Sequence, residues 1–237
     1  MLALSRFGEL ITGGKAVEIE GFPGIEVRRF LLFRSFLSFP YTLPTDTPLP
    51  ERTLRLIKAR YTGGEIALTY HHSAATLTFP SPVVRRGAKY HRERRRLIRR
   101  AEERCEVMEE VPFDTFYALY SETVKGYGRK PIPERRMRDV YSLEGVETVG
   151  VKVEDRVVGV LMSLALPDRY LLWQMGWEGP NFVPTYLLHL GIERGFALGY
   201  DTVDLGISPS PSSLKLKSEM GGDVDRKVYV IRWRRVV

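Results

Sequence analysis

Residues 151–163 read V-K-V-E-D-R-V-V-G-V-L-M-S, two runs of β-branched residues on either side of the acidic pair Glu154-Asp155. β-Branched side chains favour strands, and a short polar pair between two such runs favours a reverse turn. The stretch therefore predicts a β-hairpin with strands at 146–153 and 156–166. A second apolar run at 169–177 predicts a third strand, antiparallel to the hairpin.

The chain after this third strand changes its periodicity. The sequence Gly-Pro-Asn at 179–181 predicts a turn. The elements expected next are a helix at 184–198, a short strand at 202–205, a loop with a short helix at 209–220, and a last strand at 227–233. Because a helix connects them, the strands at 169–177 and 202–205 should run parallel. We expect them to diverge and open a cleft.

The chain before the hairpin divides at Pro80-Ser81-Pro82, which predicts a boundary between two domains. Residues 1–83 are expected to form a shortened α/β subdomain, and residues 84–237 the main domain. The elements expected in the first part are strands at 25–33, 65–70 and 75–79 and a helix at 51–61; those expected in the second are a basic helix within 85–104, a short strand at 105–111, and helices that start at Pro112 and Pro133.

The composition excludes several classes of protein. The chain has 237 residues, of which 43% are hydrophobic, and a single cysteine, Cys105, which excludes a disulfide framework. No run approaches the roughly 18 apolar residues of a membrane span, and the first residues do not resemble a signal peptide. We therefore expect a soluble, cytoplasmic protein without membrane partners. One asparagine and one glutamine beside 27% charged residues indicate a thermophilic source.

The positive charge of the protein is concentrated in one segment. The formal net charge is +7, and residues 85–104 hold ten Lys or Arg against three Asp or Glu. The residues that should lie off the apolar stripe of this helix are Arg92, Arg95, Arg96 and Arg99. They are candidates for binding the phosphates of tRNA or another polyanion. The alternative is a solvated helix whose arginines pair with protein carboxylates.

The order of elements after Cys105 resembles the GNAT acyltransferase fold, in which three antiparallel strands precede a helix and a further strand. The pieces that resemble its Fem-type branch, the FemABX peptidyltransferases, are the Arg-rich helix with the two helices after it, P-T-Y-L-L-H-L-G-I-E-R-G-F-A-L-G-Y-D-T-V-D-L-G at 184–206, and L-K-L-K-S-E-M-G-G at 214–222. The resemblance implies a mixed α/β fold with a shortened N-terminal GNAT-like half.

The segment at 178–188 departs from the GNAT pattern. GNAT enzymes that use acetyl-CoA carry a glycine pair before the helix, where backbone amides bind the diphosphate. Here the segment reads E-G-P-N-F-V-P-T-Y-L-L and lacks that pair. The resemblance therefore favours an aminoacyl-tRNA donor over acyl-CoA, although an acyl-CoA enzyme with an atypical loop stays open. No tightly bound cofactor is expected.

Three residues are candidates for catalysis of acyl transfer. Lys217 matches the family lysine that is thought to stabilise the oxyanion of the intermediate. Lys215, two residues earlier on the same helix, should face away from the cleft. Asp204, at the end of a strand, could orient a nucleophile or cap a turn. Glu178 could act as a general base. The non-catalytic alternatives are that Lys217 is a surface lysine and that Asp204 forms a turn.

Five residues around the end of the third strand are candidates for binding the donor. They are Gln174, Trp177, Asn181, Thr185 and Tyr186. The competing interpretation is core packing for the tryptophan and turn formation for the asparagine. No metal site is expected, because His71 and His72 should point to opposite faces of a strand.

Two hypotheses follow. The first is an acyl- or aminoacyltransferase that moves the acyl group from a thioester or aminoacyl-tRNA to an amine. The second is a non-catalytic polyanion- or nucleic-acid-binding module on the same fold.

Overall fold

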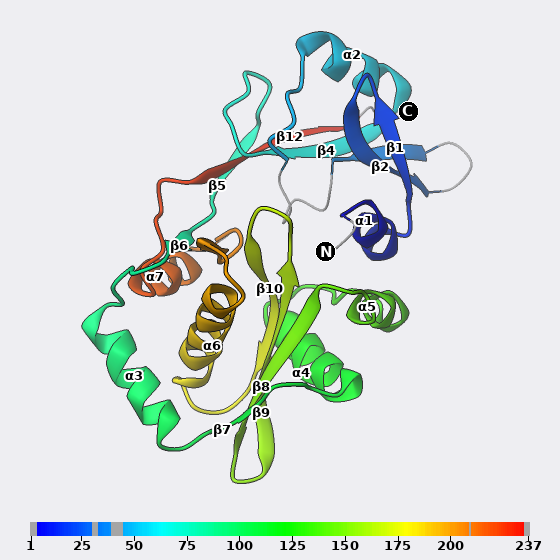
Figure 1. Cartoon of the computed structure of the whole chain (residues 1–237). Helices are drawn as coiled ribbons and strands as arrows, with labels where there is room; N and C mark the ends of the chain where they lie inside the picture. The colour runs from blue at the N-terminus through cyan, green and yellow to red at the C-terminus, as the bar shows by residue number, and fades with distance from the viewer. Residues whose placement is uncertain (1–3, 30–32, 39–44, 209, 235–237) are drawn as a thin grey trace. The chain divides into compact units, whose positions relative to one another are not determined.

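The computed structural model describes residues 4–29, 33–38, 45–208 and 210–234. These residues form two compact units, each built on one six-stranded sheet with helices beside it (Figure 1). One unit comprises Ser81–Asp225. The other comprises the chain up to Pro80 together with the chain from Arg226 onward. The expected mixed α/β fold is confirmed, because both sheets combine antiparallel and parallel pairs.

The sheet that contains the N-terminal strands has the strand order β1-β2-β3-β4-β12-β5. Its elements are α1 (Leu4–Thr12), β1 (Lys15–Ile19), β2 (Phe22–Arg29), β3 (Phe33–Leu37), α2 (Glu51–Arg60), β4 (Gly63–Leu68), β5 (Leu77–Pro80) and β12 (Lys227–Arg234). Leu54 and Ile57 of α2 pack on Phe36, Ile66 and Ile231 in one core. Helix α1 was not anticipated, and the run expected as one strand at 25–33 is divided between β2 and β3.

The last strand corrects the expected domain arrangement. The sequence placed 227–233 in the C-terminal domain, but β12 pairs antiparallel with both β4 and β5. It therefore completes the sheet that begins at the N-terminus. The alternation of the buried Val228 and Val230 with Lys227 and Tyr229 predicts a strand there, whereas the partner of this strand is set by long-range packing that the pattern does not encode.

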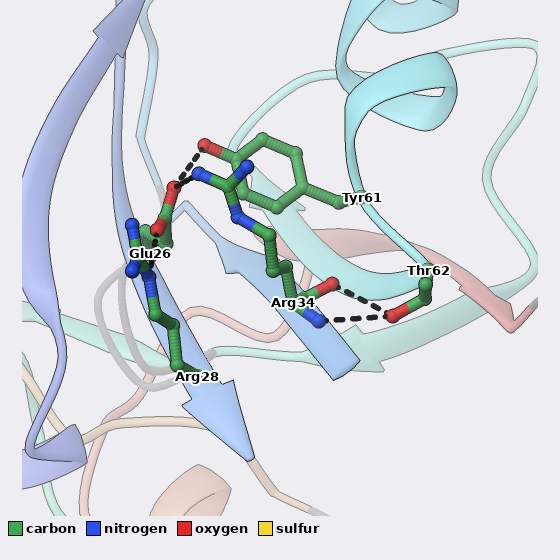
Figure 2. A network of polar contacts seen from close by, with 5 residues as sticks. All are labelled: Glu26, Arg28, Arg34, Tyr61 and Thr62. Atoms are coloured by element: carbon green, nitrogen blue, oxygen red, sulfur yellow. Dashed lines mark hydrogen bonds and ion pairs between the residues drawn. The ribbon is translucent and has the colours of Figure 1, made fainter. Parts of the chain in front are cut away.

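A polar network lies within this N-terminal sheet (Figure 2). The buried carboxylate of Glu26 accepts hydrogen bonds from Arg28 Nε at 2.8 Å, Arg34 Nη2 at 2.7 Å and Tyr61 Oη at 3.1 Å. Burial by itself raises the pKa of Glu26, but these three donors outweigh burial and lower the pKa to about 2. The network joins β2, β3 and the end of α2.

The second sheet has the strand order β6-β11-β10-β9-β8-β7. The elements of this unit are β6 (Val83–Arg85), α3 (Arg92–Glu102), β7 (Glu106–Met108), α4 (Phe113–Gly126), α5 (Glu134–Tyr141), β8 (Val146–Val153), β9 (Arg156–Ala165), β10 (Tyr170–Trp177), α6 (Val183–Ala197), β11 (Thr202–Asp204) and α7 (Pro211–Glu219). The hairpin of β8 and β9 turns at Glu154 and Asp155, both with positive φ, as the sequence predicts.

Two glycines show which helix covers which face of this sheet. A Cβ at Gly159 of β9 would lie 2.5 Å from Val183 of α6, and a Cβ at Gly176 of β10 would lie 2.4 Å from the backbone nitrogen of Tyr120 in α4. The pairing of Gly159 with Trp177 places Gly176 on the opposite face. Helix α6 therefore packs on one face and α4 on the other, with α3 beside α6 (Figure 1).

Candidate functional site

The strands β10 and β11 run parallel, as predicted, and pair at two positions only, at the start of β10 and the end of β11. Tyr170 lies opposite Val203 and Leu171 opposite Asp204, after which β10 continues to Trp177 without β11 beside it. The chain after β11 turns at Gly206, which has a φ of +72°. Parallel strands that separate after two residue pairs leave one edge of β10 free of its neighbour, so the point of separation is a candidate site.

Asp204 lies buried at this point, with 1% of its surface exposed. Its Oδ1 accepts a hydrogen bond from the backbone N–H of Gly206 at 2.8 Å, and Arg169 Nε lies 3.5 Å from Oδ2. The carboxylate therefore holds the turn after β11 and stands next to a cation. The sequence left two roles open for Asp204, to orient a nucleophile or to cap a turn, and this geometry favours the turn cap.

Lys217 of α7 reaches this turn. Its Nζ donates hydrogen bonds to the carbonyl oxygens of Gly206 at 3.0 Å and Ile207 at 2.8 Å. Burial lowers the pKa of Lys217 to about 8, although the Asp204 carboxylate opposes the change. An ammonium group has three N–H donors, so two bonds to carbonyls leave one for a ligand.

The neighbouring lysine differs, as the sequence predicts. Lys215 is exposed, and its Nζ lies 4.0 Å from Glu219. Helix α7 ends at the positive φ of Gly221, and the N–H of Gly222 bonds to the carbonyl of Lys217 at 3.0 Å. Glycine four residues after the lysine is therefore required by the end of the helix.

Glu178 does not join this group. It follows β10 at the end remote from Asp204, seven residues beyond the pairing position Leu171, or roughly 20 Å along the strand. Its side chain is 40% exposed and pairs with Arg156 at 2.7 Å. Glu178 is therefore not grouped with the other two catalytic candidates, Lys217 and Asp204, because a carboxylate that follows β10 lies at the far end of the divergence.

The five expected donor-binding residues differ in their exposure to solvent. Asn181 is exposed, Gln174 and Trp177 are half-buried, and Thr185 and Tyr186 are buried. Thr185 Oγ1 accepts a hydrogen bond from Arg94 Nη1 at 3.0 Å. Phe182, the residue at the N-cap of α6, is also buried, with Arg100 over its ring at 5.7 Å. Side chains of α3 therefore cover the N-terminal end of α6.

The basic helix is shorter than the segment 85–104. Arg85 ends β6, and α3 begins at Arg92, after His91 Nδ1 accepts a hydrogen bond from the N–H of Glu93. The four arginines expected off the apolar stripe, Arg92, Arg95, Arg96 and Arg99, are all exposed. Arg96 pairs with Glu93 of its own helix at 2.9 Å. Within the described part of the chain, the other three make no ion pair with a carboxylate.

Arg94 has a structural role that the sequence did not indicate. It bonds Glu219 of α7 at 2.7 Å in addition to Thr185 of α6, and so fastens three helices together. The sequence places Arg95 and Arg96 off the apolar stripe, but the partners of Arg94 on α6 and α7 are set by packing between residues far apart in sequence.

A separate cavity of about 710 Å³ lies between α6 and β8. Its polar lining includes Glu147, Ser163, Tyr170 and Arg194, and it contains none of the candidate site residues. Among the described residues, no three His, Cys, Asp or Glu side chains are grouped as ligands of a metal ion. No helix in the described ranges is both long and apolar enough to cross a membrane.

The comparisons with known proteins agree with this fold. The family model for the acetyltransferase (GNAT) domain matches residues 85–212, more than half of the chain. The chain therefore belongs to the GNAT acetyltransferase-domain family. None of the proteins of curated function matches this sequence significantly.

Solved structures share the architecture at low sequence identity. The structure of L-PGS from Bacillus licheniformis has a TM-score of 0.67 at 14% identity and covers 100% of this chain and 88% of its own. FemX has a TM-score of 0.69 at 10% identity, with coverage of 98% and 91%. The C-terminal domain of a putative lysylphosphatidylglycerol synthetase from Agrobacterium fabrum has a TM-score of 0.63 at 10% identity, with coverage of 96% and 86%. These likenesses show a Fem-type GNAT fold over both units.

Proposed function

We propose that the protein transfers an aminoacyl group from the ester of an aminoacyl-tRNA to an amine. The observation that carries this proposal is the placement of Lys217, a largely desolvated cation held by two carbonyl oxygens where β10 and β11 separate. A fixed charge in such a place stabilises an oxyanion without reorganisation during the reaction.

In the proposed reaction the amine nitrogen attacks the ester carbonyl, and a C–N bond forms while the carbonyl oxygen becomes an oxyanion. The third N–H of Lys217 donates to that oxygen. The intermediate then collapses, the ester C–O bond breaks, and the proton lost by the amine leaves with the ribose hydroxyl. Asp204 contributes by holding the turn whose carbonyls orient the lysine.

The N-terminal end of α6 supports this donor over acyl-CoA. A diphosphate bound there would need free backbone N–H groups. Pro184 has none, the N–H groups of Val183 and Tyr186 already bond to the carbonyls of Pro180 and Phe182, and Phe182 is covered by Arg100. The exposed arginines of α3 are suited to the phosphates of tRNA. A cytoplasmic location follows from this donor, because aminoacyl-tRNA is made there.

The proposal is tested with aminoacyl-tRNA labelled in the amino acid, a panel of amines, and acetyl-CoA as a parallel donor. We expect label to move to an amine, and Lys217→Ala to lower the rate about a hundredfold, or roughly 3 kcal/mol. Lys215→Ala, on the exposed side of the same helix, is the matched control and should be near neutral. Equal losses for both variants would contradict the assignment.

A second candidate function is a non-catalytic polyanion-binding module. It is favoured by Arg92, Arg95, Arg96 and Arg99 of α3, which are all exposed. Binding of tRNA without transfer to any amine would support this function and overturn the first.

A further inference from the structure

The turn after α4 presents an exposed aromatic ring among basic residues. Residues 125–130 read K-G-Y-G-R-K, and all six are exposed. Tyr127 is 65% exposed, the largest value among the exposed large hydrophobic residues of the described chain. An aromatic face with cations around it is the usual platform for a nucleic-acid base and its phosphates.

Tyr127 is held in place by the end of the helix. Its N–H bonds to the carbonyl of Thr123 at 3.3 Å, and the N–H of Arg129 bonds to the carbonyl of Val124 at 3.1 Å. Gly128 has a φ of +67°, the left-handed conformation that closes a helix. The ring is therefore presented from an ordered helix end, and a base that stacks on it need not order a loop first.

The same ring is attached to β10. Tyr127 and Trp177 lie with ring centroids 6.2 Å apart and planes at 56°. Thr123 Oγ1 accepts a hydrogen bond from the N–H of Trp177 at 2.9 Å and lies 3.3 Å from its carbonyl oxygen. Helix α4 thus fixes the aromatic pair to the strand that diverges from β11 at the candidate site, beyond the point of separation.

The charges beside the ring match a polyanion. Lys125 pairs with Glu122 at 2.6 Å. The other two cations of this turn, Arg129 and Lys130, make no ion pair with a described residue. A Cβ added at Gly126 or at Gly128 would meet no atom within 4 Å, so the surface on either side of the ring is open.

We propose that Tyr127, supported by Trp177 and flanked by Arg129 and Lys130, is a stacking site for an unpaired base in the last few nucleotides of an RNA. The inference rests on the proposed function, for it assigns the single-stranded end of the tRNA donor to the edge of β10. Trp177 lies six residues beyond Leu171, or roughly 20 Å along β10, so the base stacked on Tyr127 would precede the esterified nucleotide at Lys217 by a few nucleotides.

The test uses a pentanucleotide RNA that ends in cytidine-cytidine-adenosine and follows tryptophan fluorescence. Base stacking at Tyr127 should quench Trp177, which lies beside it. We expect Tyr127→Ala to weaken binding about tenfold and remove most of the quench, and Tyr127→Phe, which keeps the ring, to bind within about twofold of the parent. Leu198→Ala, an exposed apolar residue after α6, is the control and should have no effect.

Three further arms decide the ligand. Replacing Arg129 and Lys130 with Gln should flatten the salt dependence of binding. A duplex of the same sequence should bind without the quench, since its bases are not free to stack. CoA that quenches Trp177 equally and competes with the RNA would overturn the RNA assignment, as would unchanged affinity in Tyr127→Ala. This assay measures binding and needs no acyl transfer. A failure of RNA stacking can therefore be distinguished from a failure of the proposed transferase activity.

Discussion

Lys217 shows how one residue can acquire its chemistry from burial. An exposed lysine keeps its proton far above neutral pH, whereas burial at the turn after β11 brings the pKa of Lys217 to about 8. The protonation state of this side chain therefore changes within the range in which the protein can be assayed.

The first prediction concerns the pH dependence of transfer. If Lys217 stabilises an oxyanion it must be protonated, so the rate should fall as the pH rises through about 8. Measurements of kcat/KM between about pH 6 and 10, corrected for spontaneous ester hydrolysis, would show this limb. Lys217→Arg should keep its charge over the whole range and lose the limb, at a lower rate. A rate that rises through this pKa would mean that the neutral amine acts as a base.

The second prediction concerns the Glu26 network of Figure 2. Tyr61→Phe removes a hydrogen bond to a buried carboxylate and should lower the free energy of unfolding by about 2 kcal/mol. Since the pKa of Glu26 is lowered to about 2, the network stabilises fully above the unfolded value of about 4.5 and is lost as the pH falls toward 2. The difference between parent and variant should shrink over that interval.

Urea denaturation followed through Trp233, which lies in the same unit, measures this difference. Tyr127→Phe, in the other unit, is the control. A difference that does not change between about pH 7 and about pH 2 would show that the hydroxyl acts independently of the charge on Glu26.

At the scale of elements, helix α3 divides its arginines between two tasks. Arg94 is half-buried and bonds α6 and α7, while Arg92, Arg95, Arg96 and Arg99 face solvent. The helix therefore serves as a structural brace on one side and presents a basic surface on the other.

The third prediction uses this division. Replacement of Arg92, Arg95, Arg96 and Arg99 with Gln should weaken tRNA or heparin binding. It should also reduce the slope of log affinity against log salt by up to the equivalent of about four phosphate contacts. The melting temperature should stay within a few degrees. Arg94→Gln serves as the comparison. It should lower the melting temperature and change the slope of log affinity against log salt by the equivalent of about one phosphate contact or less. Unchanged affinity in the fourfold variant would make α3 purely structural.

Local pattern predicted most elements but not their partners. The hairpin of β8 and β9, the helix α6 and the parallel direction of β11 follow from residue periodicity and from the helix between two strands. The pairing of β12 and the outward ion pair of Glu178 depend on contacts between residues far apart in sequence. Lys217 could be found because a resemblance pointed to it. Tyr127 has a visible signal, an aromatic residue between two glycines with flanking cations, but glycines in such a pattern are equally typical of a helix end.

For the whole molecule, the fourth prediction follows from the path of the chain. A protein that ends at Asp225 lacks β12, which lies between β4 and β5. We expect the N-terminal sheet of this truncated chain to lose protection from hydrogen exchange while β8, β9 and β10 keep theirs, because every strand of their sheet is retained. Added peptide 226–237 should restore protection in β4 and β5 if the gap between them is the cause. Protection of β4 and β5 in the truncated chain without the peptide would contradict this.

The position of β12 also sets the order in which the protein can be completed on the ribosome. Domains commonly fold from the N-terminus as they emerge, at about 5–20 residues per second. Here β5 leaves the ribosome long before its neighbour β12, so the edges of β4 and β5 stay unpaired for roughly ten to thirty seconds while the second unit is made and folds. The part synthesised first is thus finished last. Proteolysis of stalled nascent chains of increasing length would reveal this inverted order, as protection of 81–225 before that of β1 to β5.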